Sequence, residues 1–265
     1  MNLTSDIRQR LQHRPVLLMT HLVLGYPSLD INRRVIRQMA ENGVDCIELQ
    51  IPFSEPMADG PVILKANQTA LAGGIRVADC LAFAGEVVRE FPGVNFFFMT
   101  YYNIVFRYGE EAFIKRAVQI GVKGLIIPDL PPEEGASCLR LCREHQIAPI
   151  MFFTPTSTDE RMREVARHGD GFIYCVARKG VTGSKTTMDD TLAGHLARYR
   201  AATDLPLAVG FGIAGREDVA MLEGRADMAV IGTATIKLVD REGPEAVGPF
   251  ITGLLTKEDT LNREA

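Results

Sequence analysis

One arrangement repeats along the whole sequence: a short apolar run is followed by a stretch whose apolar residues recur every three or four positions. Recurrence every three or four positions is typical of amphipathic helices, as in Ile31, Val35 and Met39. The apolar runs are expected to be β-strands. They are Val16–Leu24, Cys46–Ile51, Asn95–Thr100, Gly124–Pro128, Pro149–Phe153, Gly171–Val176, Leu205–Phe211 and Met228–Gly232. Strands that alternate with helices predict an α/β fold on a parallel sheet.

The apolar runs are nearly continuous, as in Gly-Leu-Ile-Ile-Pro, and do not alternate with polar residues. Such strands are covered on both faces, either in a closed (β/α)8 barrel or in an open doubly wound sheet. Two observations favour the barrel: the repeats fill all 265 residues, and no Gly-x-Gly-x-x-Gly follows the first strand. No linker or charged block divides the chain. We therefore expect one TIM-barrel domain, residues 1–265, with a polar tail at 256–265 that frays.

Composition excludes several classes of function. The net charge of −4 gives no reason to expect nucleic acid or an anionic membrane as a partner, so local groups must hold any anionic substrate. Cys138 and Cys142 stand four apart on an expected helix, but no third ligand follows at suitable spacing, and no metal site is expected. No run is long enough to span a bilayer and no leader-like segment precedes the first helix. We expect a cytoplasmic protein.

Glu48 is the first candidate for chemistry, because it lies inside the apolar strand Cys-Ile-Glu-Leu-Gln-Ile-Pro. A carboxylate in such a strand is costly unless it is paired or functional. Active sites of (β/α)8 barrels lie at the C-terminal ends of the strands and in the loops that follow. One interpretation of Glu48 is general acid–base catalysis, and the other is a structural ion pair within the barrel.

Asp59 lies in the next loop, directly before Gly60-Pro61. Its alternative interpretation is a turn or helix N-cap aspartate. A carboxylate at a strand end and another in the loop beside it would nevertheless face one barrel mouth. Together Glu48 and Asp59 predict an acid–base site.

Glycines at the ends of the last strands predict a phosphate site. Gly183 ends a mobile-looking loop, and Gly210, Gly212 and Gly232 with Thr233 follow the seventh and eighth strands. Small residues there let backbone amides and a helix N-terminus approach phosphate oxygens, and this fold often binds phosphate at that point. The alternative is a set of tight turns without a ligand.

Several stretches together resemble the alpha subunit family of tryptophan synthase, in order and spacing over about the whole chain. The most specific is Glu-Leu-Gln-Ile-Pro-Phe-Ser-Glu-Pro-Met-Ala-Asp-Gly-Pro at positions 48–61. The others are Arg-Lys-Gly-Val-Thr-Gly at 178–183, Gly-Phe-Gly-Ile at 210–213, Gly-Thr-Ala at 232–234, Met-Thr-Tyr-Tyr-Asn at 99–103 and Pro-Asp-Leu-Pro at 128–131.

The resemblance implies cleavage of indole-3-glycerol phosphate to indole and glyceraldehyde 3-phosphate, in tryptophan biosynthesis. Glu48 would protonate the indole ring carbon and handle the protons of the substrate hydroxyls, and Asp59 would accept from the indole N–H and stabilise the cationic ring. The phosphate would be held by Gly183, Phe211, Gly212, Gly232 and Thr233. The indole pocket and its closing loop would comprise His21, Ile63, Met99, Tyr101, Ile126, Phe152, Tyr174 and Thr182, with Thr182 binding Asp59 on closure.

The resemblance also implies a partner. The chain would work in an α2β2 heterotetramer with a beta subunit that consumes indole. Pyridoxal phosphate would belong to that subunit, and this chain would hold no cofactor. We place the interface at Pro52, Glu55 and Asp129.

The sequence departs from the family pattern at a few positions. Gln50 stands where glycine is usual, Glu55 where aspartate is usual, Thr233 where serine is usual, and Thr20-His21 where a proline-aromatic pair is usual. Thr233 keeps the hydroxyl. His21 either changes the polarity of the pocket or is a core histidine with a backbone partner.

Three alternatives stay open. The Glu55 departure motivates a stand-alone lyase that releases free indole. A non-catalytic regulatory barrel is disfavoured by the presence of both Glu48 and Asp59. A phosphate-sugar isomerase shares only the fold.

Overall fold

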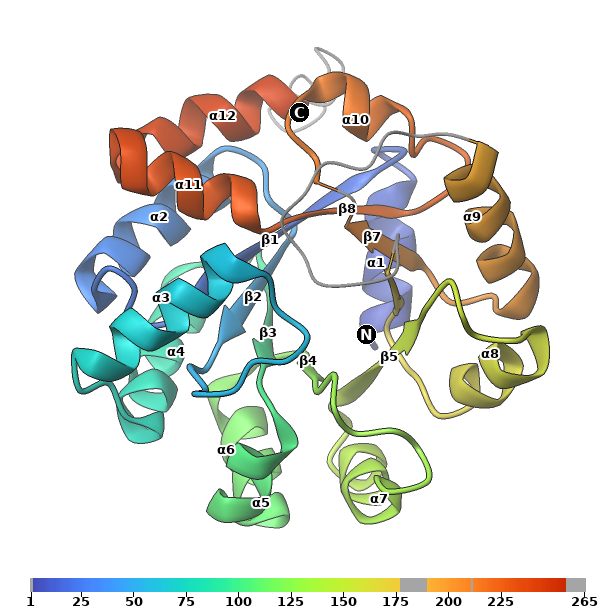
Figure 1. Cartoon of the computed structure of the whole chain (residues 1–265), viewed down its shortest axis with the longest axis horizontal. Helices are drawn as coiled ribbons and strands as arrows, with labels where there is room; N and C mark the ends of the chain where they lie inside the picture. The colour runs from blue at the N-terminus through green and yellow to red at the C-terminus, as the bar shows by residue number, and fades with distance from the viewer. Residues whose placement is uncertain (1, 177–189, 211, 256–265) are drawn as a thin grey trace.

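Eight parallel strands close into a barrel in the computed structural model, which describes residues 2–176, 190–210 and 212–255 (Figure 1). The strands are β1 Leu17–Val23, β2 Cys46–Gln50, β3 Asn95–Met99, β4 Gly124–Ile126, β5 Ala148–Phe153, β6 Ile173–Val176, β7 Leu207–Gly210 and β8 Met228–Ile231. Each strand pairs with its neighbours in sequence, and β8 pairs with β1. The eight expected strands and the barrel are confirmed, with strand ends displaced by one or two residues.

Helices surround the barrel on its outside (Figure 1). They are α2 Leu29–Glu41, α3 Pro61–Ala72, α4 Val77–Glu90, α5 Tyr102–Tyr108, α6 Glu110–Ile120, α7 Ala136–Glu144, α8 Asp159–Ala166, α9 Asp190–Ala202, α10 Arg216–Ala220, α11 Thr233–Glu242 and α12 Val247–Leu254, with a 3-10 turn η1 at Pro244–Ala246. Among the described residues, no helix combines the length and apolar character needed to cross a membrane.

Helix α1, Leu3–Leu11, has a different place, because it closes one end of the barrel. Its residues Leu3 and Ile7 pack in the interior cluster with Leu17, Cys46 and Met228, which are the first residues of β1, β2 and β8. The end where the strands begin is therefore filled by apolar side chains. Inside the barrel, a ligand site is therefore expected at the opposite end, where the strands finish.

The alternation of strand side chains decides which residues face that open end. In β2, Ile47 and Leu49 belong to the core between the barrel and its helices, whereas Cys46 belongs to the interior cluster. Glu48 and Gln50 share the parity of Cys46, so both side chains point into the barrel. They lie at the C-terminal half of their strand.

The seal made by α1 gives a stability prediction. Gly171 precedes β6 with φ +78°, and a Cβ there would lie 2.4 Å from Leu3 Cδ2. Gly171→Ala should lower the free energy of unfolding by about 2–4 kcal/mol, from backbone strain and from displacement of α1. Gly74→Ala is the matched control, because φ is +83° there and an added Cβ would have no neighbouring atom within 4 Å. The free energy of unfolding of Gly74→Ala, measured with denaturant, should fall by about 1 kcal/mol. Equal losses for the two variants would contradict the close packing of α1 against Gly171.

Candidate active site

Glu48 lies deep in the barrel and is 2% exposed. The register sets it between His21 of β1 and Phe97 of β3, and His21 Nδ1 lies 3.0 Å from Glu48 Oε2. Its other oxygen, Oε1, is buried and has no hydrogen-bond partner among the described residues. Glu48 is therefore held at one oxygen, while the other has bonding capacity to spare. Of the two interpretations of His21, the core histidine with a backbone partner is wrong for Nδ1, whose partner is this carboxylate.

Asp59 lies in the loop between β2 and α3, and its side chain turns toward the barrel. Gln50 Nε2 donates to Asp59 Oδ2 at 2.7 Å, and the Tyr101 hydroxyl donates to the same oxygen at 3.1 Å. The N-cap of α3 is Gly60, without a side-chain capping bond. The alternative interpretation of Asp59 as an N-cap is therefore wrong. Bonds from β2 and from the end of β3 bring it to the same mouth as Glu48.

The loop that carries Asp59 is fixed from two sides. The Ala58 amide donates to the Tyr101 hydroxyl at 3.0 Å, and the Phe53 ring stacks on Tyr101 with centroids 5.1 Å apart. Asn67 of α3 is buried and accepts from the Phe53 amide at 2.9 Å. The sequence did not predict that Phe53 and Asn67 hold this loop in place. It named Gln50 as a departure, although its shared parity with Glu48 was a signal that it faces the site.

Burial and charge shift the protonation of these groups. Burial raises the pKa of Asp59, and the charge of His21 with the bonds from Gln50 and Tyr101 only partly offsets it. Burial opposes a charge on His21, but Glu48, Asp59 and Gln50 outweigh it, so the pKa of His21 is raised above 6.5. Burial also raises the pKa of Tyr174 and that of Tyr101, so both hydroxyls stay protonated. The site thus combines two carboxyl groups, a histidine with a raised pKa, and neutral phenols.

Unpaired polar atoms gather in this region. Four buried side-chain atoms have no hydrogen-bond partner within the described ranges: His21 Nε2, Glu48 Oε1, Gln50 Oε1 and Thr100 Oγ1. Such atoms are unusual in folded proteins. All four come from β1, β2 or the residue directly after β3. Three of them, His21 Nε2, Glu48 Oε1 and Gln50 Oε1, come from inward-facing residues and indicate a polar ligand at this end of the barrel. Thr100 has the parity of Phe98 and points toward the helices.

An apolar wall faces the carboxylates. Met99, Tyr101 and Ile126 belong to the interior cluster, and Phe152 and Tyr174 pack against it. The rings of Phe152 and Tyr174 lie 5.3 Å apart between centroids. A flat apolar ligand fits such a surface. Ile63 is not brought to this wall, because it packs with Val23, Ala66, Ala70 and Ile236 in a cluster that joins β1, α3 and α11.

The expected phosphate groups follow β7 and β8. Gly232 precedes α11, whose first residue is Thr233, and no side chain caps that helix N-terminus. A Cβ on Gly232 would lie 3.7 Å from the His21 Cβ, which places the helix start beside β1. Gly212 is exposed with φ +85°, a conformation that favours glycine. Gly183, Thr182 and Phe211 lie outside the described residues.

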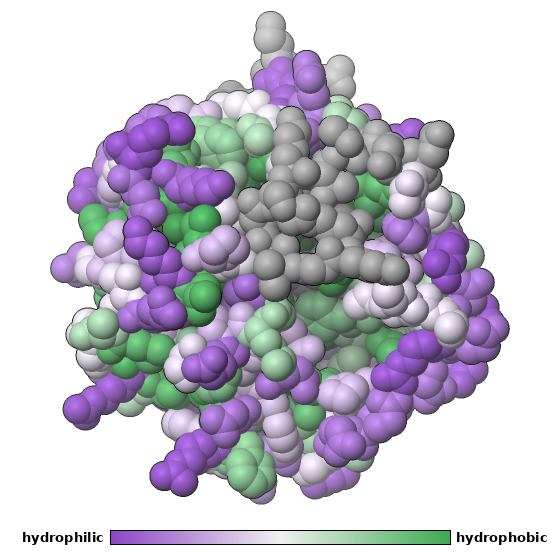
Figure 2. All heavy atoms as spheres, in the orientation of Figure 1, coloured by the Kyte–Doolittle hydropathy of each residue, from purple (hydrophilic) through white to green (hydrophobic). Residues whose placement is uncertain are grey.

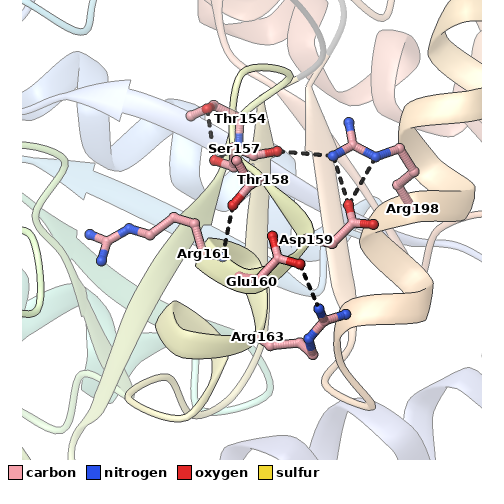
Figure 3. Close-up of polar contacts among 8 residues, drawn as sticks. All are labelled: Thr154, Ser157, Thr158, Asp159, Glu160, Arg161, Arg163 and Arg198. Carbon is pink, nitrogen blue, oxygen red and sulfur yellow. Dashed lines mark hydrogen bonds and ion pairs between the residues drawn. The ribbon is translucent and has the colours of Figure 1, made fainter.

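A polar network fixes the rim beyond β5 (Figure 3). Arg198 of α9 donates to Asp159 Oδ1 at 2.7 Å and to the Ser157 carbonyl at 3.0 Å. Thr158 caps α8 by accepting from the Arg161 amide. These contacts join α9 to the loop after β5 and hold the β5 side of the mouth, where Phe152 lies.

Of the residues expected at a partner interface, Glu55 and Asp129 are exposed and Pro52 is buried. Asp129 Oδ1 accepts from the Tyr102 amide at 2.8 Å. Met57, in the same loop as Glu55, is 77% exposed. Figure 2 shows hydrophilic side chains around the edge of the face seen in Figure 1 and hydrophobic atoms nearer its centre.

Within the described residues, no group of three His, Cys, Asp or Glu could hold a metal ion. Cys138 and Cys142 are buried and free. The arrangement described above supports acid–base chemistry by side chains on a ligand with a polar part and a flat apolar part.

Both the sequence and the fold are similar to those of known proteins. The sequence model of the family described as "Tryptophan synthase alpha chain" matches residues 7–250. A protein of that name from Desulfotalea psychrophila is 58% identical over 254 residues, covering 96% of this chain and 100% of its own. Tryptophan synthase from Mycobacterium tuberculosis has a similar solved chain, with TM-score 0.88, 32% identity and coverage of 95% and 96%. A chain of the Pyrococcus furiosus tryptophan synthase complex gives TM-score 0.82, 28% identity and coverage of 90% and 97%.

Proposed function

The chain belongs to the tryptophan synthase alpha chain family, and we propose that Glu48 and Asp59 carry out its reaction. The chain cleaves indole-3-glycerol phosphate to indole and glyceraldehyde 3-phosphate, without a cofactor of its own. The observation that carries the proposal is the convergence of two buried or partly buried carboxylates, each anchored at one oxygen, on one barrel mouth.

In the proposed mechanism, Glu48 donates a proton to ring carbon C3, which leaves a cation centred on the indole nitrogen. The Asp59 carboxylate accepts from the indole N–H and stabilises that cation, so negative charge is fixed where positive charge develops. Glu48, now a carboxylate, accepts the proton of the substrate hydroxyl as the carbon–carbon bond breaks and its electrons return to the ring. Glu48 ends protonated, as it began. The unpaired Glu48 Oε1 supports this role.

We place the phosphate at Gly183, Phe211, Gly212, Gly232 and Thr233. Gly232 and Thr233 support the placement. They lie at the uncapped N-terminus of α11, which offers backbone amide groups and the positive end of the helix dipole. We place the indole ring against Met99, Tyr101, Ile126, Phe152 and Tyr174, with His21 at the edge and Thr182 on the closing loop. Ile63 is the weakest member of that set, since it packs elsewhere.

The phosphate site gives a direct prediction. Thr233→Asp puts a negative charge at the first position of α11, where it would repel a phosphate. KM for indole-3-glycerol phosphate should rise at least about tenfold. The protein should not lose stability, because an acidic residue suits a helix N-terminus. Steady-state kinetics and thermal unfolding measure the two effects. The control is Thr158→Asp at the N-cap of α8, which should leave KM unchanged, and an unchanged KM in Thr233→Asp would contradict the placement.

The chain works with a tryptophan synthase beta subunit, and pyridoxal phosphate belongs to that subunit. We propose that Glu55 and Asp129 contact the partner and that Pro52 shapes the loop from inside, which agrees with the exposure of the first two and the burial of the third. We further propose that residues 1–265 form one domain and act in the cytoplasm. The pairing of β8 with β1 and the family's biosynthetic role support these two statements.

The experiment that tests the function is an assay of indole released from indole-3-glycerol phosphate, with and without a beta subunit. The proposal expects indole in both cases and a higher rate with the partner. An equal rate in both would support a stand-alone lyase. Binding of substrate without indole release would support a non-catalytic barrel and overturn the catalytic roles.

A further inference from the structure

His21 and Glu48 form a pair that the reaction described above does not use. They lie side by side in the register of β1 and β2, and Nδ1 to Oε2 is 3.0 Å. Both side chains are almost fully enclosed, with exposed fractions of 6% for His21 and 3% for Glu48. A bond between an imidazole and a carboxylate at such depth is a charge-assisted one whenever the imidazole is protonated.

The bond makes the two carboxylate oxygens of Glu48 unequal. Glu48 Oε2 is occupied by His21, whereas Oε1 has no partner among the described residues. An imidazolium on Oε2 stabilises the carboxylate that remains after Oε1 gives up a proton. Proton transfer from Glu48 to a substrate carbon would then be more favourable with His21 charged than with His21 neutral.

Two ionisable groups act directly on His21. Glu48 comes from β2 and Asp59 from the loop after it, and both are acidic. On the other side of β1, the strand β8, Met228–Ile231, carries no ionisable side chain. Tyr174 of β6 acts on Glu48, and burial raises the pKa of its hydroxyl, so it stays neutral. Burial opposes the charge on His21, but the acidic neighbours Glu48 and Asp59 raise its pKa above the ordinary value.

We propose that His21 is a positioning residue for Glu48, which holds one carboxylate oxygen and, through its positive charge, promotes proton donation by the other. The proposal rests on the assignment of Glu48 as the acid–base group. It predicts that the rate declines at alkaline pH, as His21 loses its proton. Activity is highest while His21 is charged and falls as pH rises through its raised pKa.

Two variants separate the charge from the shape. His21→Asn keeps an N–H donor near the position of Nδ1 but cannot be charged, and His21→Phe removes both. With His21→Asn, kcat should be about tenfold below the unchanged protein at pH 6, because a charge-assisted bond is stronger than a neutral one. The deficit should shrink as pH rises above the His21 pKa. His21→Phe should be slower than His21→Asn at every pH.

The control is His168→Asn. His168 forms another histidine–glutamate pair, with Glu164 at 3.5 Å, but that pair is on the outer surface near α8. This variant should keep the rate and pH profile of the unchanged protein. Binding of glycerol 3-phosphate to each variant shows whether the phosphate site is still formed.

The decisive readout is the shape of the kcat profile from pH 6 to pH 9. Loss of the alkaline ionisation in His21→Asn supports the proposal. A uniform loss at all pH values, or no loss, overturns it. If His21→Phe does not fold, NMR titration of the His21 ring in the unchanged protein and in Glu48→Gln replaces it: a pKa above 6.5 that falls in the variant is expected, and an unchanged pKa refutes the pairing. An active Glu48→Gln would instead overturn the proposed function itself.

Discussion

Glu48→Gln is expected to lower kcat for indole formation about a thousandfold, within the usual range for loss of a general acid–base group. Glutamine has nearly the same size and can still accept a bond from His21 Nδ1, so the barrel should fold. It cannot give up or take the proton that the cleavage moves. The loss should therefore lie in kcat, with little change in KM, and steady-state measurement of indole release at saturating substrate tests it.

The same segment provides the control for that variant. Glu55→Gln removes an exposed carboxylate seven positions along, and the isolated chain should keep its rate. Binding of glycerol 3-phosphate to Glu48→Gln should match that of the unchanged protein. A Glu48→Gln variant that binds this probe and keeps more than about a tenth of the rate would refute the role of Glu48.

Asp59→Asn should reduce kcat by about a hundredfold to a thousandfold, the usual effect of removing one preorganised electrostatic contact to a developing charge. Asparagine can still accept from Gln50 Nε2 and Tyr101, so the loop should keep its place. The neutral amide no longer stabilises a cationic ring. The expected result is a low kcat with an unchanged unfolding temperature, measured by indole release and by thermal unfolding.

The pH dependence gives a second readout for Asp59. Burial raises its pKa, so the carboxyl takes up a proton at a higher pH than an ordinary aspartate does. Activity needs the carboxylate form, is complete above that pKa and falls as pH is lowered through it. Asp59→Asn should lack this acid decline. An acid decline that persists unchanged in the variant would assign it to another group.

The sequence predicted the barrel well, because each strand is a short apolar run and the apolar residues of the helices recur every three or four positions. Glu48 stood out in the sequence as a carboxylate inside an apolar strand, and the structure showed that its side chain faces the barrel interior. The α1 seal was not predicted. Leu3 and Ile7 look like one face of any amphipathic helix, and only the folded chain shows that this face enters the barrel.

The site was predicted less completely, for a physical reason. Side-chain bonds between strands depend on register, and the sequence does not reveal which residues of β1 and β2 lie side by side. His21 was therefore known only as an unusual residue, and its bond to Glu48 came from the structure. Gln50 was known as a departure from the family pattern, and its bond to Asp59 depends on how the loop folds back. Ile63 was assigned to the pocket from the family pattern, and the structure packs it with Val23 and Ile236. Its contact with a ligand stays a prediction.

Glu48 and Asp59 are proposed to act together on one bound substrate. The most direct measurement compares indole release by Glu48→Gln, Asp59→Asn and the double variant at saturating indole-3-glycerol phosphate. Groups that act as a unit give losses that do not multiply, so the double variant should be only about as slow as Glu48→Gln alone. Losses that multiply in full would mean that the two carboxylates act independently, and would contradict the account.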